Sequence, residues 1–364
     1  MTKVLFILKY RETDYGDYKD SPVDPKKDWA YTKGLSSGLY NSARFVVEML
    51  NENPNYEVKM VQVIDNNCID REVTQFKPDI VVIEAYWVVP EKFAVLTKLH
   101  PKVTWIIRNH SNTPFLANEG IAFGWTIDYV KYPNVWVASN HRNAHRELGV
   151  IIGETHPASG ICYLPNYYPV DVPTYSFPKT TKHKHILNVG CFGAIRPLKN
   201  HVIQAIAAIE YAQKHGKHLK FHINGSRVEG NGAPILKNLR DIFTRVDNAE
   251  LVEHPWFDHK EFNRLICKMD IGLQVSFTET FNIVAADFAI NNVPIVTSDE
   301  IHWSDPLMRA HPTDSASIVK AMERAMFVHD TMPWIKPHIK GLKNYNKLSR
   351  KDWYETIDWF TQIN

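Results

Sequence analysis

Two short segments of the sequence combine charged side chains with a helix start, where anions bind. Residues 276–287 read SFTETFNIVAAD, with Glu279 in a turn after an apolar run and Asp287 further along the helix. The N–H groups of residues 281–284 would lie at the helix start and form an anion site. A carboxylate beside such a site suits the hydroxyls of a sugar linked to a phosphate. The simpler interpretation makes Glu279 a charge at the helix start that the helix dipole favours, and Asp287 part of a solvated helix face.

The second segment, residues 190–200, reads GCFGAIRPLKN. Gly190 and Gly193 allow a tight turn after a strand, and Arg196 and Lys199 then place two cations before a helix. A strand, a glycine turn, two cations and a helix favour a diphosphate site. A surface loop with solvated cations is the alternative. The pattern GxxxxGK[ST] is absent from this segment, which disfavours an ATPase or kinase of that class.

Two weaker signals lie in the first half of the chain. Residues 33–38, KGLSSG, are rich in glycine and serine, and they either hold a phosphate or sugar through backbone N–H groups or simply turn the chain. His110 follows an apolar run at residues 103–107, so it would lie at the carboxyl end of a strand, where α/β sheets bind ligands. A structural role for this single histidine remains open.

The elements that must position these residues alternate between apolar runs and helical patterns. Strands are predicted at 4–8, 58–64, 80–84, 103–107, 135–138, 186–189, 219–223, 250–252, 271–275 and 294–296. Helices are predicted at 39–50, 93–99, 141–148, 202–212, 235–243, 260–267, 282–290 and 351–362. Strands that are apolar on both faces and separated by helices indicate parallel sheets.

The alternation of strands and helices restarts after residues 165–184, whose prolines, tyrosines and basic residues have the composition of a linker. We therefore predict an α/β protein with two Rossmann-like, doubly wound domains that face a central cleft. The expected domains are residues 1–168 and 169–349. A final helix at 350–364 is expected to pack back on the first domain.

Composition limits the functional classes. The 364 residues are 44% hydrophobic and 23% charged, and the net charge of +2 implies neither nucleic acid nor an anionic membrane as a partner. The four cysteines are far apart and form no CxxC pair, and the histidines form no HExxH motif. No apolar stretch approaches the roughly 20 residues of a membrane span. We expect a cytoplasmic protein without stable membrane insertion and without a bound metal.

The set of motifs resembles the family 4 glycosyltransferases, which have the GT-B fold. That family has an E-x7-E motif between a strand and a helix, and Glu279 and Asp287 match its two acids, with Asp in place of the second Glu. Thr280 and Asn282 replace the usual glycines around Phe281. The spacing of Arg196 and Lys199 is shorter than usual. The other matching segments are Ser276, Thr278, 292–296 (NVPIV), 190–200, 164–166 (LPN), 135–139 (VWVAS) and 34–38.

The resemblance implies a metal-independent transfer, with retention at the sugar, from a nucleotide-diphosphate sugar such as a UDP-sugar; no cofactor is required. Arg196 and Lys199 would neutralise the diphosphate, Glu279 would hold the sugar, Asp287 would bind the ribose, and His110 would lie near the reacting carbon. The further donor contacts that it implies are the N–H groups of Phe281, Asn282 and Ile283, the glycine-turn residue Gly193, Asn224 and Gly225 near the phosphate, Trp256 in a loop at the base, and Gly34, Ser36, Ser37 and Gly38.

The acceptor is less well determined. Residues 36–41, 114–119 and 190–200 resemble glycosyltransferases of tailed bacteriophages, which implies a 5-hydroxymethylpyrimidine in DNA as the acceptor and the host cytoplasm as the location. Residues 9–38 are rich in aromatic residues and lysine, which suits nucleic acid or sugar. However, residues 1–175 contain 18 Lys and Arg against 20 Asp and Glu, whereas DNA-binding proteins usually present a basic face.

Other functions therefore stay open. A glycosyltransferase that acts on a bacterial polysaccharide or lipopolysaccharide is the first alternative. A nucleotide-sugar epimerase of the same fold is the second, and a binding module for nucleotide sugars or DNA is the third. An oxidoreductase is disfavoured because the GxGxxG fingerprint is absent.

Overall fold

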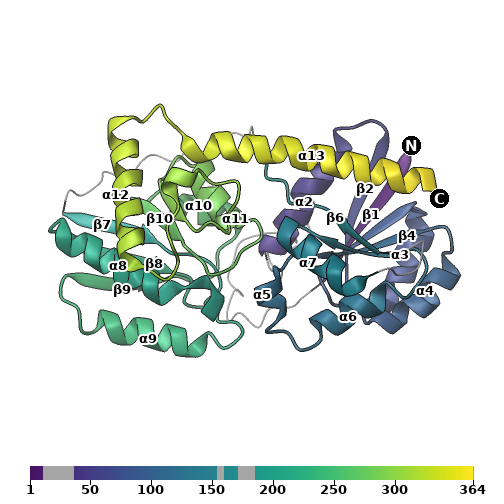
Figure 1. Cartoon of the computed structure of the whole chain (residues 1–364), viewed down its shortest axis with the longest axis horizontal. Coiled ribbons are helices and arrows are strands. Elements are labelled where there is room, and N and C mark those ends of the chain that lie inside the picture. Colours follow the sequence, from purple (N-terminus) through teal and green to yellow (C-terminus); the bar gives the residue numbers. More distant parts are fainter. Residues whose placement is uncertain (11–36, 154–159, 171–184, 364) are drawn as a thin grey trace, which may run out of the picture. The chain divides into compact units, whose positions relative to one another are not determined.

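The structure is a computed structural model that describes residues 1–10, 37–153, 160–170 and 185–363. The chain divides into two compact units (Figure 1). Unit 1 comprises Met1–Pro169 and Tyr345–Asn364, and unit 2 comprises Val170–Asn344. Each unit has its own parallel sheet covered by helices, so the α/β fold class is confirmed.

Unit 1 is built on a six-stranded sheet with the order β2-β1-β3-β4-β5-β6, in which every pair of neighbours is parallel. Its strands are β1 (Thr2–Lys9), β2 (Tyr56–Val63), β3 (Ile80–Glu84), β4 (Thr104–Asn109), β5 (Val135–Ser139) and β6 (Gly160–Tyr163). Its helices are α2 (Ser37–Asn51), α3 (Ile69–Phe76), α4 (Phe93–Leu99), α5 (Thr113–Leu116), α6 (Ala122–Tyr129) and α7 (Arg142–Ile152).

Both faces of this sheet are buried, which explains why its strands read as continuous apolar runs. Side chains alternate along β1, so that Phe6 points to one face and Ile7 to the other. The Phe6 face packs against α2 and against the carboxyl-terminal part of α13 (Pro337–Ile363) through Trp353. The Ile7 face packs against α3 and α4.

Unit 2 has a five-stranded parallel sheet with the order β11-β10-β7-β8-β9. Its strands are β7 (Ile186–Gly190), β8 (His218–Ile223), β9 (Ala249–Glu253), β10 (Ile271–Gln274) and β11 (Ile295–Thr297). Its helices are α8 (His201–Lys214), α9 (Ala233–Phe243), α10 (His259–Ile266), α11 (Ile283–Ile290) and α12 (Ser315–Thr331), and α13 begins in it.

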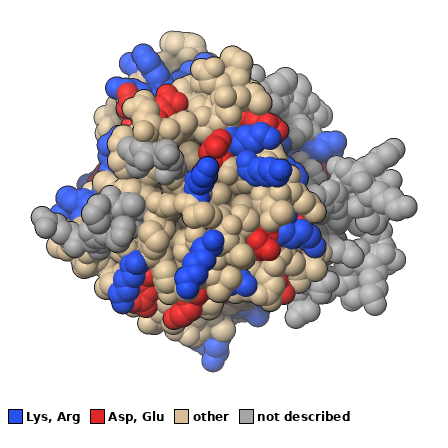
Figure 2. Space-filling view, turned by 90° about the vertical axis from the view of Figure 1, so that its right-hand side faces the viewer, with Lys and Arg blue, Asp and Glu red and all other residues tan. Residues whose placement is uncertain are grey.

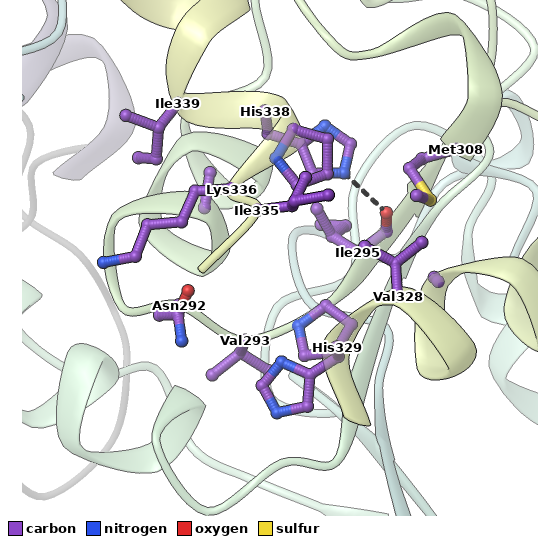
Figure 3. Close-up of a pocket in the computed structure, with 14 residues that line it drawn as sticks. Asn292, Val293, Ile295, Met308, Val328, His329, Ile335, Lys336, His338 and Ile339 are labelled. Atoms are coloured by element: carbon purple, nitrogen blue, oxygen red, sulfur yellow. Dashed lines mark hydrogen bonds between the residues drawn. The ribbon is translucent and has the colours of Figure 1, made fainter. Parts of the chain in front are cut away.

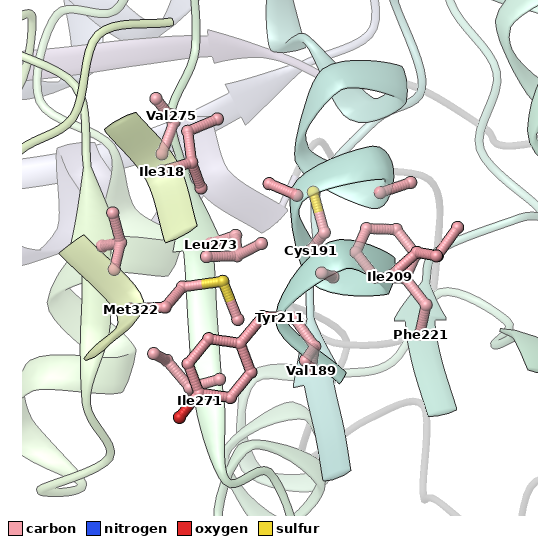
Figure 4. Packing of buried hydrophobic residues seen from close by; sticks show 14 of the residues in the cluster. Val189, Cys191, Ile209, Tyr211, Phe221, Ile271, Leu273, Val275, Ile318 and Met322 are labelled. Carbon is pink, nitrogen blue, oxygen red and sulfur yellow. The ribbon is translucent and has the colours of Figure 1, made fainter. Parts of the chain in front are cut away.

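The two faces of the unit 2 sheet are packed differently. On one face Val189, Phe221 and Leu273 meet side chains of α8 and α12 (Figure 4). On the other face Gly190 and Gly272 let α11 come close, because a Cβ at either position would lie within 2.9 Å of the Phe288 ring. The glycine at the end of β7 is therefore required by packing.

The structure corrects several predicted elements. The final helix begins at Pro337 rather than at residue 351. Four helices, α3, α5, α6 and α12, and the strand β6 lie where the sequence analysis predicted no element. The short, partly buried strand β6 extends the unit 1 sheet beyond β5, with Cys162 opposite Ala138.

Candidate active site

The glycine turn after β7 is held from the end of β8. Gly193 has a φ of +115°, a conformation that favours glycine, and its N–H donates to Oδ1 of Asn224 at 2.9 Å. Asn224 also donates to the carbonyl of Pro255 at 3.4 Å. The side chain of Asn224 thus fixes the turn, and its contact with a phosphate stays a prediction.

The predicted diphosphate and sugar residues meet in unit 2. The Nζ of Lys199, at the end of a short helical turn (Pro197–Lys199), forms an ion pair with Glu279. Glu279 also accepts from Ser276 Oγ and from Asn282 Nδ2, both at 3.1 Å. The two side chains are mostly buried, with 13% and 8% exposed. Burial lowers the pKa of Lys199, and the carboxylate of Glu279 opposes that shift.

The start of α11 lies next to this ion pair. Asn282 adopts a φ of 64°, and its Oδ1 caps the helix by accepting from the N–H of Ala285 at 2.9 Å. Its Nδ2 also donates to Gln274 at the end of β10, at 2.8 Å. The carbonyl of Phe281 accepts from Trp303 Nε1 at 2.7 Å. These bonds fix the backbone of residues 281–283, whose N–H groups the sequence analysis assigned to a phosphate.

Asp287 has a partner that the sequence analysis missed. Its carboxylate is 2.7 Å from Nε2 of His259, the first residue of α10, and only 1% of the residue is exposed. The structure therefore places Asp287 in a buried carboxylate–imidazole pair rather than on an open helix face. A ribose at Asp287 would share the carboxylate with His259. The histidine directly precedes the helix predicted at 260–267, a position that gives no signal of an ion pair.

A second cluster of cations lies at the loops after β7 and β8. Arg196 is 3.8 Å from Glu229, which also pairs with Arg227 at 2.6 Å. The guanidinium of Arg227 lies over the ring of Trp256, 4.3 Å from its centre. Trp256, predicted as a stacking face, thus already carries a cation on one face. Arg227 was not predicted, although it follows a strand by four residues.

Gly225 is a point of close backbone approach near this cluster. A Cβ added to it would lie 2.2 Å from the carboxylate of Glu253, so this position has no room for a side chain. Glu253 is in turn held by two hydrogen bonds from Arg240, at 2.7 and 2.8 Å. The glycine at residue 225 is therefore explained by packing against Glu253, with or without a ligand.

In unit 1, His110 is part of a buried triad at the ends of β3 and β4. Its Nε2 bonds to the carboxylate of Glu84. That carboxylate also accepts a hydrogen bond from Nη1 of Arg108 at 3.0 Å. Burial alone would raise the pKa of Glu84, but the charges of Arg108 and His110 outweigh it and hold the pKa below its ordinary value. Burial lowers the pKa of His110. Glu84 was missed as a functional residue; the only signal was a carboxylate inside an apolar run.

The residues of the glycine-rich segment are only partly described. Gly34 and Ser36 lie outside the described residues, as does most of residues 9–38. Helix α2 begins at Ser37, and Gly38 follows in its first turn, where a Cβ would meet nothing within 4 Å. The predicted role of this segment in holding a phosphate or sugar therefore stays a prediction.

A pocket in unit 2 lies apart from these residues. It is lined by residues of α11, β11, α12, the start of α13 and the loops between them, among them Val293, Val328 and Ile335 (Figure 3). His338 closes one side, where its Nε2 bonds to the carbonyl of Ile295 at 3.0 Å. None of the predicted site residues lines this pocket.

The described part of the chain offers neither a metal cluster nor a membrane-spanning helix. No group of three or more His, Cys, Asp or Glu side chains is arranged there to hold a metal ion. None of the helices found there carries an apolar stretch that could span a bilayer.

Comparison with known proteins shows the fold. No protein-family model matches the chain. One curated protein, an uncharacterised 41.2 kDa protein in the cps region of Klebsiella pneumoniae, is 27% identical over 62 residues, which is 17% of each chain.

Three solved structures match nearly the whole chain at low identity. A trehalose-6-phosphate synthase is 11% identical, with a TM-score of 0.67 and 99% of each chain covered. A UDP-forming α,α-trehalose-phosphate synthase from Burkholderia vietnamiensis is 10% identical, with a TM-score of 0.63, over 97% of this chain and 99% of that one. A sucrose-phosphate synthase from Thermosynechococcus elongatus is 12% identical, with a TM-score of 0.61, over 100% and 98%. The chain therefore has the GT-B fold of these glycosyltransferases.

Proposed function

We propose that the protein is a metal-independent, retaining glycosyltransferase that moves a sugar from a UDP-sugar to an acceptor hydroxyl. One observation carries the proposal. Lys199 and Glu279 meet between the loops after β7 and β10, directly beside the start of α11. Ligands of open parallel sheets bind beyond these carboxyl ends, and the residue types are those that a sugar diphosphate requires.

The cations serve the leaving group. In the transfer, the bond between the anomeric carbon and the diphosphate oxygen breaks, and its electron pair goes to the diphosphate. Lys199 and Arg196 would stabilise the charge that develops there, together with the N–H groups at the start of α11. Two fixed cations supply positive charge that a divalent metal would otherwise supply. The acceptor hydroxyl forms the new bond on the same face of the sugar and loses its proton to the leaving diphosphate.

The remaining residues would hold the other parts of the donor. Glu279 accepts hydroxyls of the sugar, and this requires that its ion pair with Lys199 open or be shared when the donor binds. One carboxylate oxygen of Asp287 binds the ribose, while His259 holds the other. Trp256 lies beside the base, with Arg227 against its other face. His110, held by Glu84, contacts the sugar near the reacting carbon.

For the acceptor we propose a hydroxymethylated pyrimidine in DNA, which rests on the sequence resemblance to phage enzymes alone. Figure 2 shows Lys and Arg interspersed with Asp and Glu over the face that it presents, without a single basic patch. A hydroxyl of a bacterial glycan is therefore the second acceptor to test. In either case the donor half of the proposal is the same.

The experiment is a panel of nucleotide sugars in EDTA, each incubated with hydroxymethylated DNA, unmodified DNA or a bacterial surface glycan, with transfer read by mass spectrometry. Lys199→Met removes the cation that contacts Glu279. Lys214→Met is the matched control, because Lys214 forms an exposed ion pair with Glu323 in the same unit. The proposal predicts transfer by the wild type and by the control, and a loss of about 10²- to 10³-fold in the Lys199 variant.

The outcomes separate the parts of the proposal. Transfer to hydroxymethylated DNA alone supports the DNA acceptor, and transfer to the glycan alone replaces it. Loss of transfer in EDTA that is restored by a divalent cation overturns metal independence. Interconversion of the donor without transfer would assign the protein to the epimerases. Equal donor turnover by wild type and Lys199→Met overturns the site.

A further inference from the structure

Two histidines at neighbouring strand ends of unit 2 form a hydrogen-bonded pair that the donor site does not yet explain. His222 is near the end of β8, and His254 directly follows β9. Nδ1 of His222 is 2.9 Å from Nε2 of His254. The rings are nearly coplanar, at 12°, with centres 5.2 Å apart, so they lie edge to edge along this bond.

The direction of the bond is set from the far side of His222. Its Nε2 is 3.2 Å from Oδ1 of Asn188 on β7. The amide of Asn188 cannot turn over, because its Nδ2 and its backbone N–H both donate to one carboxylate oxygen of Asp270, at 3.3 and 2.8 Å. Turning the amide would point its oxygen at a carboxylate. The amide oxygen therefore faces His222, and Nε2 of His222 must carry the proton.

Protonation states complete the chain of bonds. Burial, with the charges of His254 and Lys220, lowers the pKa of His222 to about 3, so the ring is neutral and its Nδ1 is an acceptor. Nε2 of His254 must then be the donor in the pair. Burial, with Lys268 as a lesser cause, also lowers the pKa of His254, so its ring is neutral too. Its Nδ1 is left as an acceptor, and no described residue donates to it.

The position of His254 indicates what this acceptor recognises. Its ring lies edge-on to Phe192 of the glycine turn, with centres 6.1 Å apart, and at the same distance from Phe257. Trp256 is two residues further along the same loop. An uncharged acceptor among aromatic rings, beside a candidate diphosphate site, suits a flat heterocycle that offers an N–H.

We propose that Nδ1 of His254 accepts an N–H of the donor's nucleobase, and that His222, Asn188 and Asp270 are positioning residues that keep it an acceptor. The inference rests on the proposed function. For a UDP-sugar the donor group is N3–H of uracil. Cytosine has a lone pair at N3, which would face the lone pair of His254. The relay therefore favours uracil over cytosine.

The first test does not depend on any nucleotide. In the wild-type protein labelled with 15N-histidine, NMR at neutral pH should show both His222 and His254 as neutral Nε2–H tautomers. Finding His254 as the Nδ1–H tautomer, or as a cation, overturns the relay. Assignment uses His222→Phe and His254→Phe, with His218→Phe on the exposed amino-terminal end of β8 as the matched control.

The second test measures binding of UDP and CDP by calorimetry. The wild type and His218→Phe should bind UDP more tightly than CDP. His254→Phe should lose about 10- to 100-fold in UDP affinity, because the imino N–H is left unpaired, and should lose the preference over CDP. His254→Gln, which keeps an acceptor, should restore part of the affinity. His222→Phe should weaken UDP binding, because His254 is then free to change tautomer.

The failures of the two proposals look different. If UDP binds and sugar is transferred, yet His254→Phe keeps both the affinity and the preference, the base contact is wrong and the transferase stands. If neither nucleotide binds the wild type and no donor is turned over, the proposed function fails. The base contact then fails with it, even where the tautomers are as described.

Discussion

Each unit of the molecule holds a buried cation–carboxylate pair at the carboxyl ends of parallel strands, but the two cations differ in how far the protein uses them. Arg108 in unit 1 donates to Glu84, to the carbonyls of Leu164 and Pro165, and to Asn166, so each of its three nitrogens has a protein partner. Lys199 in unit 2 has three N–H groups and one partner among the described residues, Glu279.

The difference assigns different tasks to the two pairs. A fully buried guanidinium whose three nitrogens all contact the protein can hold strand ends together and orient a neighbour, but it is not accessible to a ligand. An ammonium with unused donors, beside a helix start, can bind an anion. We infer that Arg108 supports the fold and the orientation of His110 through Glu84, whereas Lys199 serves the donor.

The largest effect on stability is expected at Arg108. Arg108→Met would leave Glu84 as a buried carboxylate without its main cation. It would also remove the donor to the carbonyl of Leu164, whereas the carbonyl of Pro165 keeps Nε1 of Trp353 as a donor. The free energy of unfolding should fall by about 3–5 kcal/mol. Urea unfolding measures it. Lys199→Met should lose much less, because Glu279 keeps the hydroxyl of Ser276 and the amide of Asn282 as donors. Equal losses of stability in the two variants would show that Lys199 supports the fold as much as Arg108 does.

The largest effect on turnover is expected at Lys199. Lys199→Met should reduce donor turnover by about 10²- to 10³-fold, which corresponds to roughly 3–4 kcal/mol of transition-state stabilisation. Steady-state kinetics with the best donor of the panel measures it, and the thermal unfolding of each variant is recorded in parallel. A Lys199 variant that loses stability in proportion to activity would make Lys199 a structural residue like Arg108.

A pH-dependent effect is expected at His201, which follows Lys199 closely. Neither ring nitrogen has a partner among the described residues, and burial, with the charges of Lys199 and Arg196, lowers its pKa to about 3. Below pH 6.5 the unfolded chain binds a proton at this residue that the folded chain does not. Stability should therefore fall with pH, by about 1.4 kcal/mol per unit, until the pH nears 3.

The measurement is urea unfolding between pH 6 and pH 4.5. His201→Leu should lose about 2 kcal/mol less over this range than the wild type. His218→Leu is the control, because 42% of the His218 side chain is exposed and the carboxylate oxygen of Glu250 is 4.0 Å away. A wild type whose pH dependence matches that of His201→Leu would show that His201 is not held neutral.

The smallest effect is expected at Arg227. Arg227→Met removes the cation over Trp256 and one partner of Glu229, and should weaken donor binding by about 0.5–1 kcal/mol, or two- to fivefold. Calorimetry with UDP measures it. Arg227→Lys should recover part of the affinity, because a cation over the ring is retained. An effect as large as that of Lys199→Met would move the centre of the diphosphate site towards Arg227.

Sequence patterns predict those site residues that are charged and lie between the end of an apolar strand and the start of a helix. Lys199 and Glu279 could be predicted because each follows an apolar strand and precedes a helix start. Glu84, Arg227 and His259 could not be predicted, because each is linked to the candidate site only by a partner that the fold brings into contact with it. Glu84 in particular lies inside a strand that is otherwise apolar, where the sequence pattern shows only an interruption.

Helix α13 shows the same limit at the level of the fold. Its buried positions keep helical spacing but include polar residues, so hydrophobic periodicity finds only its last part; they are His338, Leu342, Asn346, Ser349, Trp353, Ile357 and Phe360. Asn346, for example, is buried because it bonds in both directions to the backbone of Tyr168. Hydrogen bonds of this kind carry no signature in a single sequence.

If Lys199 is held for an anionic ligand, calorimetric binding of UDP in EDTA depends on its ammonium group. The wild type and Lys214→Met should bind with equal affinity, and Lys199→Met should bind at least about tenfold more weakly. Equal binding by all three proteins would show that Lys199 does not bind the diphosphate. Binding that requires a divalent cation would show that the site depends on a metal.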